Sequence, residues 1–205
     1  MRLLLATTNA GKIREFTALL ADVSGLELLT PADVGGLVAV DEDGTTFAQN
    51  AEKKARIQAD AFGVAVLAED SGLEVDALGG RPGVYSARYA GEGASDEKNL
   101  NKLLEELGDT PDEQRTARYR AVMVLLDGKA PPLVADGTCE GRIARAACGS
   151  GGFGYDPIFL PRESHASGLR TMAELTPDEK NRISHRGQAS RRLVEELTKR
   201  LGGAR

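Results

Sequence analysis

One stretch in the first half of the chain decides the fold: Val64-Ala65-Val66-Leu67-Ala68-Glu69-Asp70-Ser71-Gly72. Its first five residues are continuously apolar, which is typical of a strand buried on both faces of a sheet. The acids and small residues that follow at once lie where open α/β sheets place their ligands, beyond the carboxyl end of a strand. The stretch therefore predicts a buried strand that ends in a functional site.

Outward from this strand, helical and strand patterns alternate along the chain. We expect strands over residues 3–6, 26–29, 118–126, 133–143 and 158–160. We expect helices over residues 13–20, 46–62 and 96–107, a helix that opens at Thr176-Pro177, and a last amphipathic helix through Leu193, Leu197 and Leu201. An interruption at Ser184-His185-Arg186-Gly187 is expected before that last helix. Helices interleaved with strands predict an α/β fold with a mixed sheet.

Length and composition favour a single globular domain over residues 1–205, divided at most into two lobes. The net charge is -5, aromatic residues make up 4% and tryptophan is absent, so a face for nucleic-acid binding is not indicated. No apolar run is long enough for a membrane span, and residues 1–6 are too short for a signal peptide. We therefore expect a cytoplasmic protein, and Cys139 and Cys148 as free thiols.

The segment Thr7-Thr8-Asn9-Ala10-Gly11-Lys12 follows the first expected strand and opens a helix. Backbone amides at a helix N-terminus, together with a hydroxyl, a carboxamide and an ammonium, suit a phosphate group. The spacing of a P-loop is absent. An asparagine-capped helix with a solvated lysine is the simpler alternative.

Carboxylates form the second candidate site. Asp70 and its neighbour Glu69 can hold a divalent cation through oxygen, and a carboxylate can take a proton from an attacking water. Glu42, in the acidic loop of residues 41–44, is a second metal oxygen if that loop folds over the same strand. A turn with local hydrogen bonds and a solvated loop are the alternatives.

The third candidate is the glycine-dense segment before the strand at residues 158–160. Its glycines permit close backbone approach, Phe153 can stack on a purine, and Asp156 can accept from a ring N–H or a hydroxyl. Further along, His185 and Arg186, with Lys180 upstream, provide donors for an oxyanion or a purine carbonyl. A glycine hinge with a core phenylalanine and a structural histidine are the alternatives. His165, the second histidine, receives no role.

Taken jointly, five segments resemble the inosine triphosphate pyrophosphatase-like family and occur in the family's order from near residue 3 to the final helix. They are Thr7-Thr8-Asn9-Ala10-Gly11-Lys12, Glu69-Asp70-Ser71-Gly72-Leu73, Gly80-Arg81-Pro82-Gly83-Val84-Tyr85-Ser86-Ala87-Arg88, Phe153-Gly154-Tyr155-Asp156-Pro157 and Ser184-His185-Arg186-Gly187. The resemblance implies an elongated mixed central sheet flanked by helices, with two lobes and the active-site cleft between them. It implies hydrolysis of dITP, ITP and XTP to the monophosphate and pyrophosphate with Mg²⁺, in a homodimer.

The resemblance also implies roles for individual residues. Thr7, Thr8, Asn9, Ala10, Gly11 and Lys12 would hold the triphosphate, whose charge Lys54 would offset, and Ser71 would contact the nucleotide. Glu42 and Asp70 would meet the metal, and Asp70 would also be the general base. The base pocket would consist of Phe153, Gly154, Tyr155, Asp156, Lys180, His185 and Arg186.

One residue departs from the pattern of many bacterial relatives, which carry Asp where this chain has Glu69. The longer side chain is expected to alter the geometry around the metal without removing an oxygen. Residues 81–88 are expected to shape a loop and the subunit interface.

Two rival functions remain open from the sequence. One is a pyrophosphatase for other aberrant nucleotides, such as modified pyrimidines. The other is a nucleotide-binding regulatory protein without turnover, which the presence of Asp70 and Glu42 disfavours.

Overall fold

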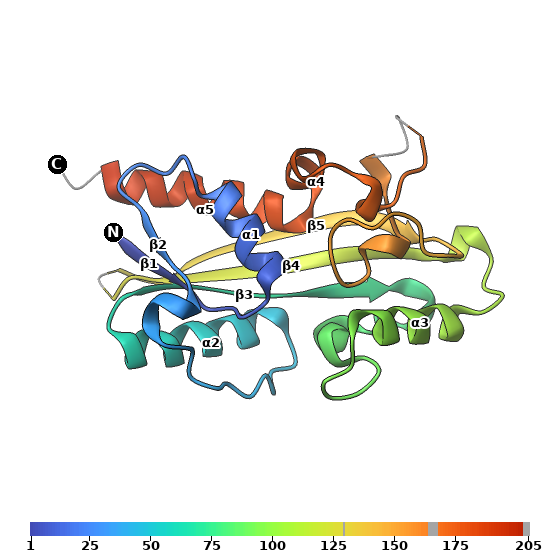
Figure 1. Ribbon diagram of the computed structural model, residues 1–205, viewed down its shortest axis with the longest axis horizontal. Coiled ribbons are helices and arrows are strands. Elements are labelled where there is room, and N and C mark those ends of the chain that lie inside the picture. Colours follow the sequence, from blue (N-terminus) through green and yellow to red (C-terminus); the bar gives the residue numbers. More distant parts are fainter. Residues whose placement is uncertain (129, 164–167, 203–205) are drawn as a thin grey trace. The chain divides into compact units, whose positions relative to one another are not determined.

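The computed structural model describes residues 1–128, 130–163 and 168–202 (Figure 1), so His165 lies outside the described residues. The strands in this part of the chain are β1 (Arg2–Leu5), β2 (Glu27–Leu29), β3 (Ala65–Val75), β4 (Thr116–Leu126), β5 (Leu133–Ile143) and β6 (Phe159–Pro161). The α-helices are α1 (Ala10–Leu19), α2 (Phe47–Phe62), α3 (Asp96–Leu107), α4 (Pro177–Ile183) and α5 (His185–Gly202).

The strands form one six-stranded sheet in the order β2-β1-β3-β4-β5-β6. β1 runs parallel to both β2 and β3, whereas β5 and β6 are antiparallel. The α/β class and the mixed sheet are thereby confirmed.

Two compact units, each assembled from separate segments, make up the chain. Unit 1 contains residues 1–70, 121–137 and 186–205, and unit 2 contains residues 71–120 and 138–185. Unit 2 has its own apolar core, in which Leu100, Leu103 and Leu107 of α3 pack with Leu73 and Tyr119.

Strand β3 is longer than the apolar run predicts. It was expected to end near Ala68, but it continues through the polar residues to Val75, so that prediction is wrong. The neighbouring strand β1 is the one that ends at this level of the sheet. Its last residue, Leu5, pairs with Leu67, and the amide of Ala6 donates to the carbonyl of Leu67 at 2.9 Å. Glu69 and Asp70 therefore lie just beyond the carboxyl end of β1, in the middle of β3. An apolar run cannot reveal this, because the strand is extended by polar side chains that are themselves buried.

The two faces of the sheet in unit 1 are covered by different helices, as Figure 1 shows for α1 and α5 on one side and α2 on the other. Leu3, Leu5 and Leu67 pack in the same cluster as Phe16 of α1 and Leu193 of α5. The alternate residues Leu4, Val66 and Ala68 pack with Ala51 and Ala55 of α2. Side chains of a strand alternate between faces, so the next two residues of β3 also face opposite sides.

Helix α5 begins earlier than expected. The chain is extended only at Ser184, with φ -66° and ψ 157°, between α4 and α5. His185, Arg186 and Gly187 were expected to interrupt the chain, but they form the first turn of α5. One extended residue is sufficient to end a helix and start another, which sequence patterns do not resolve.

The prediction for the cysteines agrees with the structure. Both cysteines are free thiols, Cys139 buried and Cys148 exposed. Within the described ranges, no helix combines the length and the apolar character that crossing a bilayer requires.

Candidate functional site

The carboxylate of Asp70 lies on the α2 face of β3 and is held at both oxygens. Lys54 approaches Oδ1 at 3.1 Å, and the amide nitrogen of Asn50 donates to Oδ2 at 3.1 Å. The same Lys54 ammonium lies 3.2 Å from Glu42. The structure therefore brings together Glu42, Lys54 and Asp70, three residues that are far apart in the sequence.

Burial changes the acidity of Asp70. Removal from water disfavours the charged form and raises the pKa of this carboxyl above its usual value of 3.8, as does the neighbouring charge of Glu42. Lys54, Lys12 and the hydrogen bond from Asn50 oppose this rise. A carboxylate with a raised pKa holds a proton more readily than an ordinary aspartate, which suits a general base.

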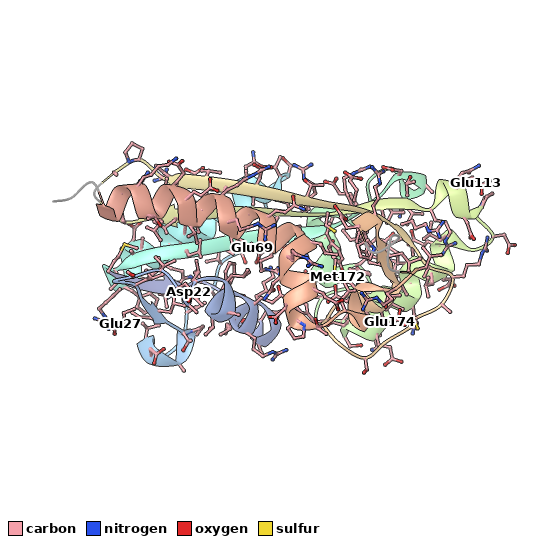
Figure 2. All side chains as sticks on the ribbon, turned by 90° about the horizontal axis from the view of Figure 1, so that it is seen from above. Asp22, Glu27, Glu69, Glu113, Met172 and Glu174 are labelled. Carbon is pink, nitrogen blue, oxygen red and sulfur yellow. The ribbon has the colours of Figure 1, made fainter. Side chains whose placement is uncertain are left out.

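Glu69 lies on the opposite face of β3, among charged groups from α1 and α5 (Figure 2). Its carboxylate is fully buried and forms ion pairs with Lys12 at 3.1 Å and with Arg186 at 2.9 Å. Arg186, itself 1% exposed in its side chain, also pairs with Glu15 of α1. Burial alone would lower the pKa of Arg186, but Glu69 and Glu15 outweigh it and raise this pKa. The guanidinium is thus a fixed, permanently charged part of unit 1.

The segment expected to hold phosphate forms the N-terminus of α1. Asn9 caps the helix, its side-chain oxygen accepting from the amide of Lys12 at 3.1 Å, and Thr7 accepts from the amide of Asn9 at 3.2 Å. Ala10 and Gly11 are the first residues of the helix, and Thr8 is exposed. The amides of this turn and the ammonium of Lys12 therefore provide a positive helix end, as the sequence predicts.

In unit 2, the segment expected to hold a purine base is organised around Asp156. Its Oδ2 accepts from the ammonium of Lys180 at 2.6 Å and from the amide of Phe153 at 2.9 Å. The Lys180 ammonium lies 4.7 Å from the centre of the Phe153 ring. Gly152 has φ 72°, and a Cβ there would lie 2.0 Å from Oδ2 of Asp156, so only glycine fits. The sequence prediction that these residues act together is consistent with this geometry.

The other expected residues of unit 2 are anchored nearby in the same unit. The ring of His185 stacks on Tyr119, with centroids 4.7 Å apart and an interplanar angle of 9°. Tyr155 donates its hydroxyl to the carbonyl of Ser86 at 2.9 Å, and the amide of Gly154 donates to Asp96 at 2.7 Å. Ser71 is half-buried in β3, directly after Asp70.

Arg186 is placed differently from the other residues expected around the base. It belongs to unit 1, where its contacts are Glu69, Glu15 and the face of Phe16, 5.9 Å from the ring centre. Lys180, His185 and the Phe153 to Asp156 segment belong to unit 2. The role of Arg186 at a base stays a prediction.

Sequence reasoning missed Asn50, Glu15 and Tyr119. The first two had a detectable signal: Asn50 precedes Lys54 by four residues and Glu15 follows Lys12 by three, spacings that place side chains on one helix face. Tyr119 had none, because its stacking on His185 joins residues far apart in sequence.

Carboxylates are the metal-binding groups that this site offers. Over the part of the chain that the structure describes, no three His, Cys, Asp or Glu side chains gather in a way that would hold a metal ion. Glu42 and Asp70 are nevertheless near enough to contact one cationic atom, the Lys54 ammonium. Mg²⁺ is typically bound by one or two carboxylates together with substrate phosphates, so this pair fits a magnesium ion that arrives with a nucleotide.

Family and sequence comparisons with known proteins point to the same family over nearly the whole chain. Residues 3–196 match the Ham1 family. A dITP/XTP pyrophosphatase of Shigella flexneri is 52% identical over 199 residues, covering 96% of this chain and 98% of that protein. A dITP/XTP pyrophosphatase of Geobacillus kaustophilus is 49% identical over 202 residues, covering 98% of this chain and 96% of that protein.

Solved structures agree with the sequence relatives. A HAM1 protein from Coxiella burnetii has a TM-score of 0.84 and 42% identity, covering 97% of this chain and 99% of that one. A nucleoside-triphosphatase, or dITP/XTP pyrophosphatase, from Mycobacterium abscessus has a TM-score of 0.74 and 44% identity, covering 94% of this chain and 98% of that one. With its sequence matched almost from end to end and its fold shared with solved members, the chain belongs to the Ham1 family.

Proposed function

We propose that this protein hydrolyses the non-standard purine nucleoside triphosphates dITP, ITP and XTP to the nucleoside monophosphate and pyrophosphate, and so removes them from the nucleotide pool. Full-length similarity to proteins named dITP/XTP pyrophosphatase supports the reaction. The single structural observation that carries it is the Asp70 carboxylate, buried and held between Lys54 and Asn50.

In this proposal Asp70 acts as the general base. Both of its oxygens have a neighbour that fixes the carboxylate plane, and a fixed base loses little entropy when it takes a proton from water. Its raised pKa makes it a better proton acceptor than an exposed aspartate.

Glu42 and Asp70 are the residues we assign to Mg²⁺. When bound with the nucleotide, this ion would offset phosphate charge and polarise the reacting phosphoryl group. Lys54, now within 3.2 Å of both carboxylates, carries the charge to neutralise phosphate oxygens.

The triphosphate itself is assigned to the N-terminal turn of α1, from Thr7 to Lys12. Helix-end amides and the Thr7, Thr8 and Asn9 side chains supply donors, and Lys12 supplies a charge that Glu69 holds in position. Ser71, next to Asp70 along β3, is assigned to the nucleotide.

Selection of the base is assigned to Phe153, Gly154, Tyr155, Asp156, Lys180 and His185, with Arg186 as a further donor. Inosine and xanthine carry a 6-oxo group where adenine carries an amine, so donors favour the oxo base and leave the amine of adenine without a partner. Lysine has three donors, and the contact of Lys180 with Asp156 directs its ammonium. Discrimination against guanine would have to depend on the 2-amino group.

A panel of nucleotides tests this function. Pyrophosphate release is measured for ITP, dITP, XTP, ATP, GTP and modified pyrimidine triphosphates, each with and without Mg²⁺. We expect release from the first three only with Mg²⁺, and much lower kcat/KM for ATP. Equal kcat/KM for ATP and ITP would refute the donor argument. Preference for a modified pyrimidine would support the rival pyrophosphatase, and binding of ITP without release would support a regulatory protein.

A homodimer and a cytoplasmic location belong to the same proposal. The homodimer follows from the family resemblance and the location from the sequence patterns, and both stay predictions. Sedimentation equilibrium of the purified protein and fractionation of cells that express it test them directly.

A further inference from the structure

The side chain of Asn50 is the most completely buried polar group of α2, with no exposed surface. Its two ends reach in different directions. The amide nitrogen donates to Oδ2 of Asp70 at 3.1 Å, and the amide oxygen accepts from the backbone N–H of Gly44 at 2.8 Å. One buried carboxamide therefore joins the centre of β3 to the acidic loop that contains Glu42.

The orientation of this carboxamide follows from its neighbours. Asp70 offers only acceptors when ionised, and the amide of Gly44 is only a donor. A reversed amide would set oxygen against carboxylate oxygen and nitrogen against N–H, losing two hydrogen bonds in a buried place. Only this arrangement satisfies both partners.

Gly44 is required for the loop to approach so closely. A Cβ at this position would lie 2.5 Å from Oδ1 of Asn50, closer than non-bonded atoms approach. The absence of a side chain at residue 44 and the carboxamide at residue 50 therefore form one fitted contact.

The same helix holds the preceding part of the loop with a second carboxamide, that of Gln58. Its nitrogen donates to the carbonyl of Val38 at 2.8 Å and its oxygen accepts from the amide of Val38 at 3.0 Å. Gln58 is also buried, but its carboxamide bonds to Val38 rather than to Asp70. It has the chemistry of Asn50 without the contact to the carboxylate.

From this geometry we propose that Asn50 is a positioning residue for the reaction: its carboxamide orients the Asp70 carboxylate and ties it to the loop that contains Glu42. This inference rests on the proposed function, in which Asp70 and Glu42 act together. Loss of the carboxamide would leave Asp70 with one directed neighbour, Lys54, and would release Gly44 from β3.

Two substitutions of Asn50 separate its two contacts. Asn50→Asp keeps an oxygen for the amide of Gly44 but replaces the donor to Asp70 by a second carboxylate oxygen. Asn50→Ala removes both contacts. Gly44→Ala disturbs the same contact from the loop, because its Cβ would lie 2.5 Å from Oδ1 of Asn50. Gln58→Ala is the matched control, because it removes a buried carboxamide of α2 that does not touch Asp70.

Three measurements are made on the full-length protein: kcat and KM for pyrophosphate release from ITP, the midpoint of thermal unfolding, and hydrogen exchange of the Gly44 and Val38 amides without nucleotide or metal. We expect Asn50→Asp to keep Gly44 protected while kcat falls about a hundredfold, the effect of a misplaced catalytic group. Asn50→Ala and Gly44→Ala should lower kcat and also speed exchange at Gly44. Gln58→Ala should speed exchange at Val38 only and leave kcat unchanged, even where the unfolding midpoint falls.

Two results would overturn the positioning role. One is an unchanged kcat in Asn50→Asp, and the other is a loss of kcat in Gln58→Ala equal to that in Asn50→Ala, which would make the effect one of general stability. Failure of the proposed function is distinguishable, because the wild-type protein itself would then release no pyrophosphate from ITP, dITP or XTP.

Discussion

Glu69 and Asp70 are neighbours in the sequence, but they occupy different chemical environments because they face opposite sides of β3. Glu69 faces α1 and α5 and lies between two cations, Lys12 and Arg186. Asp70 faces α2 and shares the Lys54 ammonium with Glu42. On one face an acid holds cations in position; on the other, two acids converge on a single cation.

The difference shows what the glutamate at position 69 does in this chain. We expected it to alter the surroundings of a metal, but its ion pairs lie on the face away from Asp70 and Glu42. Its carboxylate is committed to cations of α1 and α5, one of which, Lys12, is assigned to the triphosphate. Two adjacent acids therefore separate into a structural anchor and a proposed catalytic group.

The largest effect is expected from Asp70→Asn. The substitution removes both the proposed base and one of the two carboxylates assigned to the metal. We therefore expect kcat to fall about a thousandfold, with less effect on nucleotide affinity. Steady-state kinetics and equilibrium binding of ITP measure the two quantities. Asp43→Asn, which changes an exposed acid of the same loop as Glu42, is the control. Turnover near the wild-type rate would exclude Asp70 as the base.

On the other face, Glu69→Gln should act mainly on stability. Removing the carboxylate leaves the charge of the buried Arg186 with less compensation, so the free energy of unfolding should fall by about 3 kcal/mol. Urea unfolding measures this change. Glu27→Gln, which affects an exposed ion pair with Arg2, should change it little. A stability loss no larger than that of the control would contradict the anchoring role.

Lys12→Ala tests how the face of Glu69 contributes to substrate binding, because Lys12 pairs with Glu69 and is assigned to the triphosphate. Loss of one charge-assisted contact should raise KM for ITP about tenfold and change kcat less. The ratio of the two parameters from initial rates is the measurement. If neither KM nor kcat changes, the assigned contact is wrong.

The smallest effect is expected on the pH dependence of thermal stability, through the ionisation of Asp70. Because its pKa is raised in the folded protein, the folded state binds this proton more tightly than the unfolded chain, and the ionised carboxylate lowers stability above that pKa. Asp70→Asn should therefore unfold at the same or a slightly higher temperature than the wild type at pH 7. The difference should shrink as the pH falls toward the usual value of 3.8. A midpoint well below the wild type at pH 7 would show that the ion pair with Lys54 outweighs burial.

Much of the fold could be predicted from local patterns. Helix α3 occupies the range 96–107 that its leucine spacing indicates, and α2 begins directly after its cap Thr46. The length of β3 and the start of α5 were predicted wrongly. Both depend on residues whose own preferences are weak, so the surrounding structure decides their conformation.

The sequence by itself determined the order of the elements, the family motifs and the types of chemical group available: carboxylates after an apolar run, a capped helix with a lysine, and glycines before an acid. Only the tertiary structure decided which groups meet. The pair of Glu69 with Arg186 spans 117 residues and that of Glu15 with Arg186 spans 171. Alternation along β3 and the packing of α2 against one face and of α1 and α5 against the other separate the two acids, because the partners of a buried charge are set by neighbours in space.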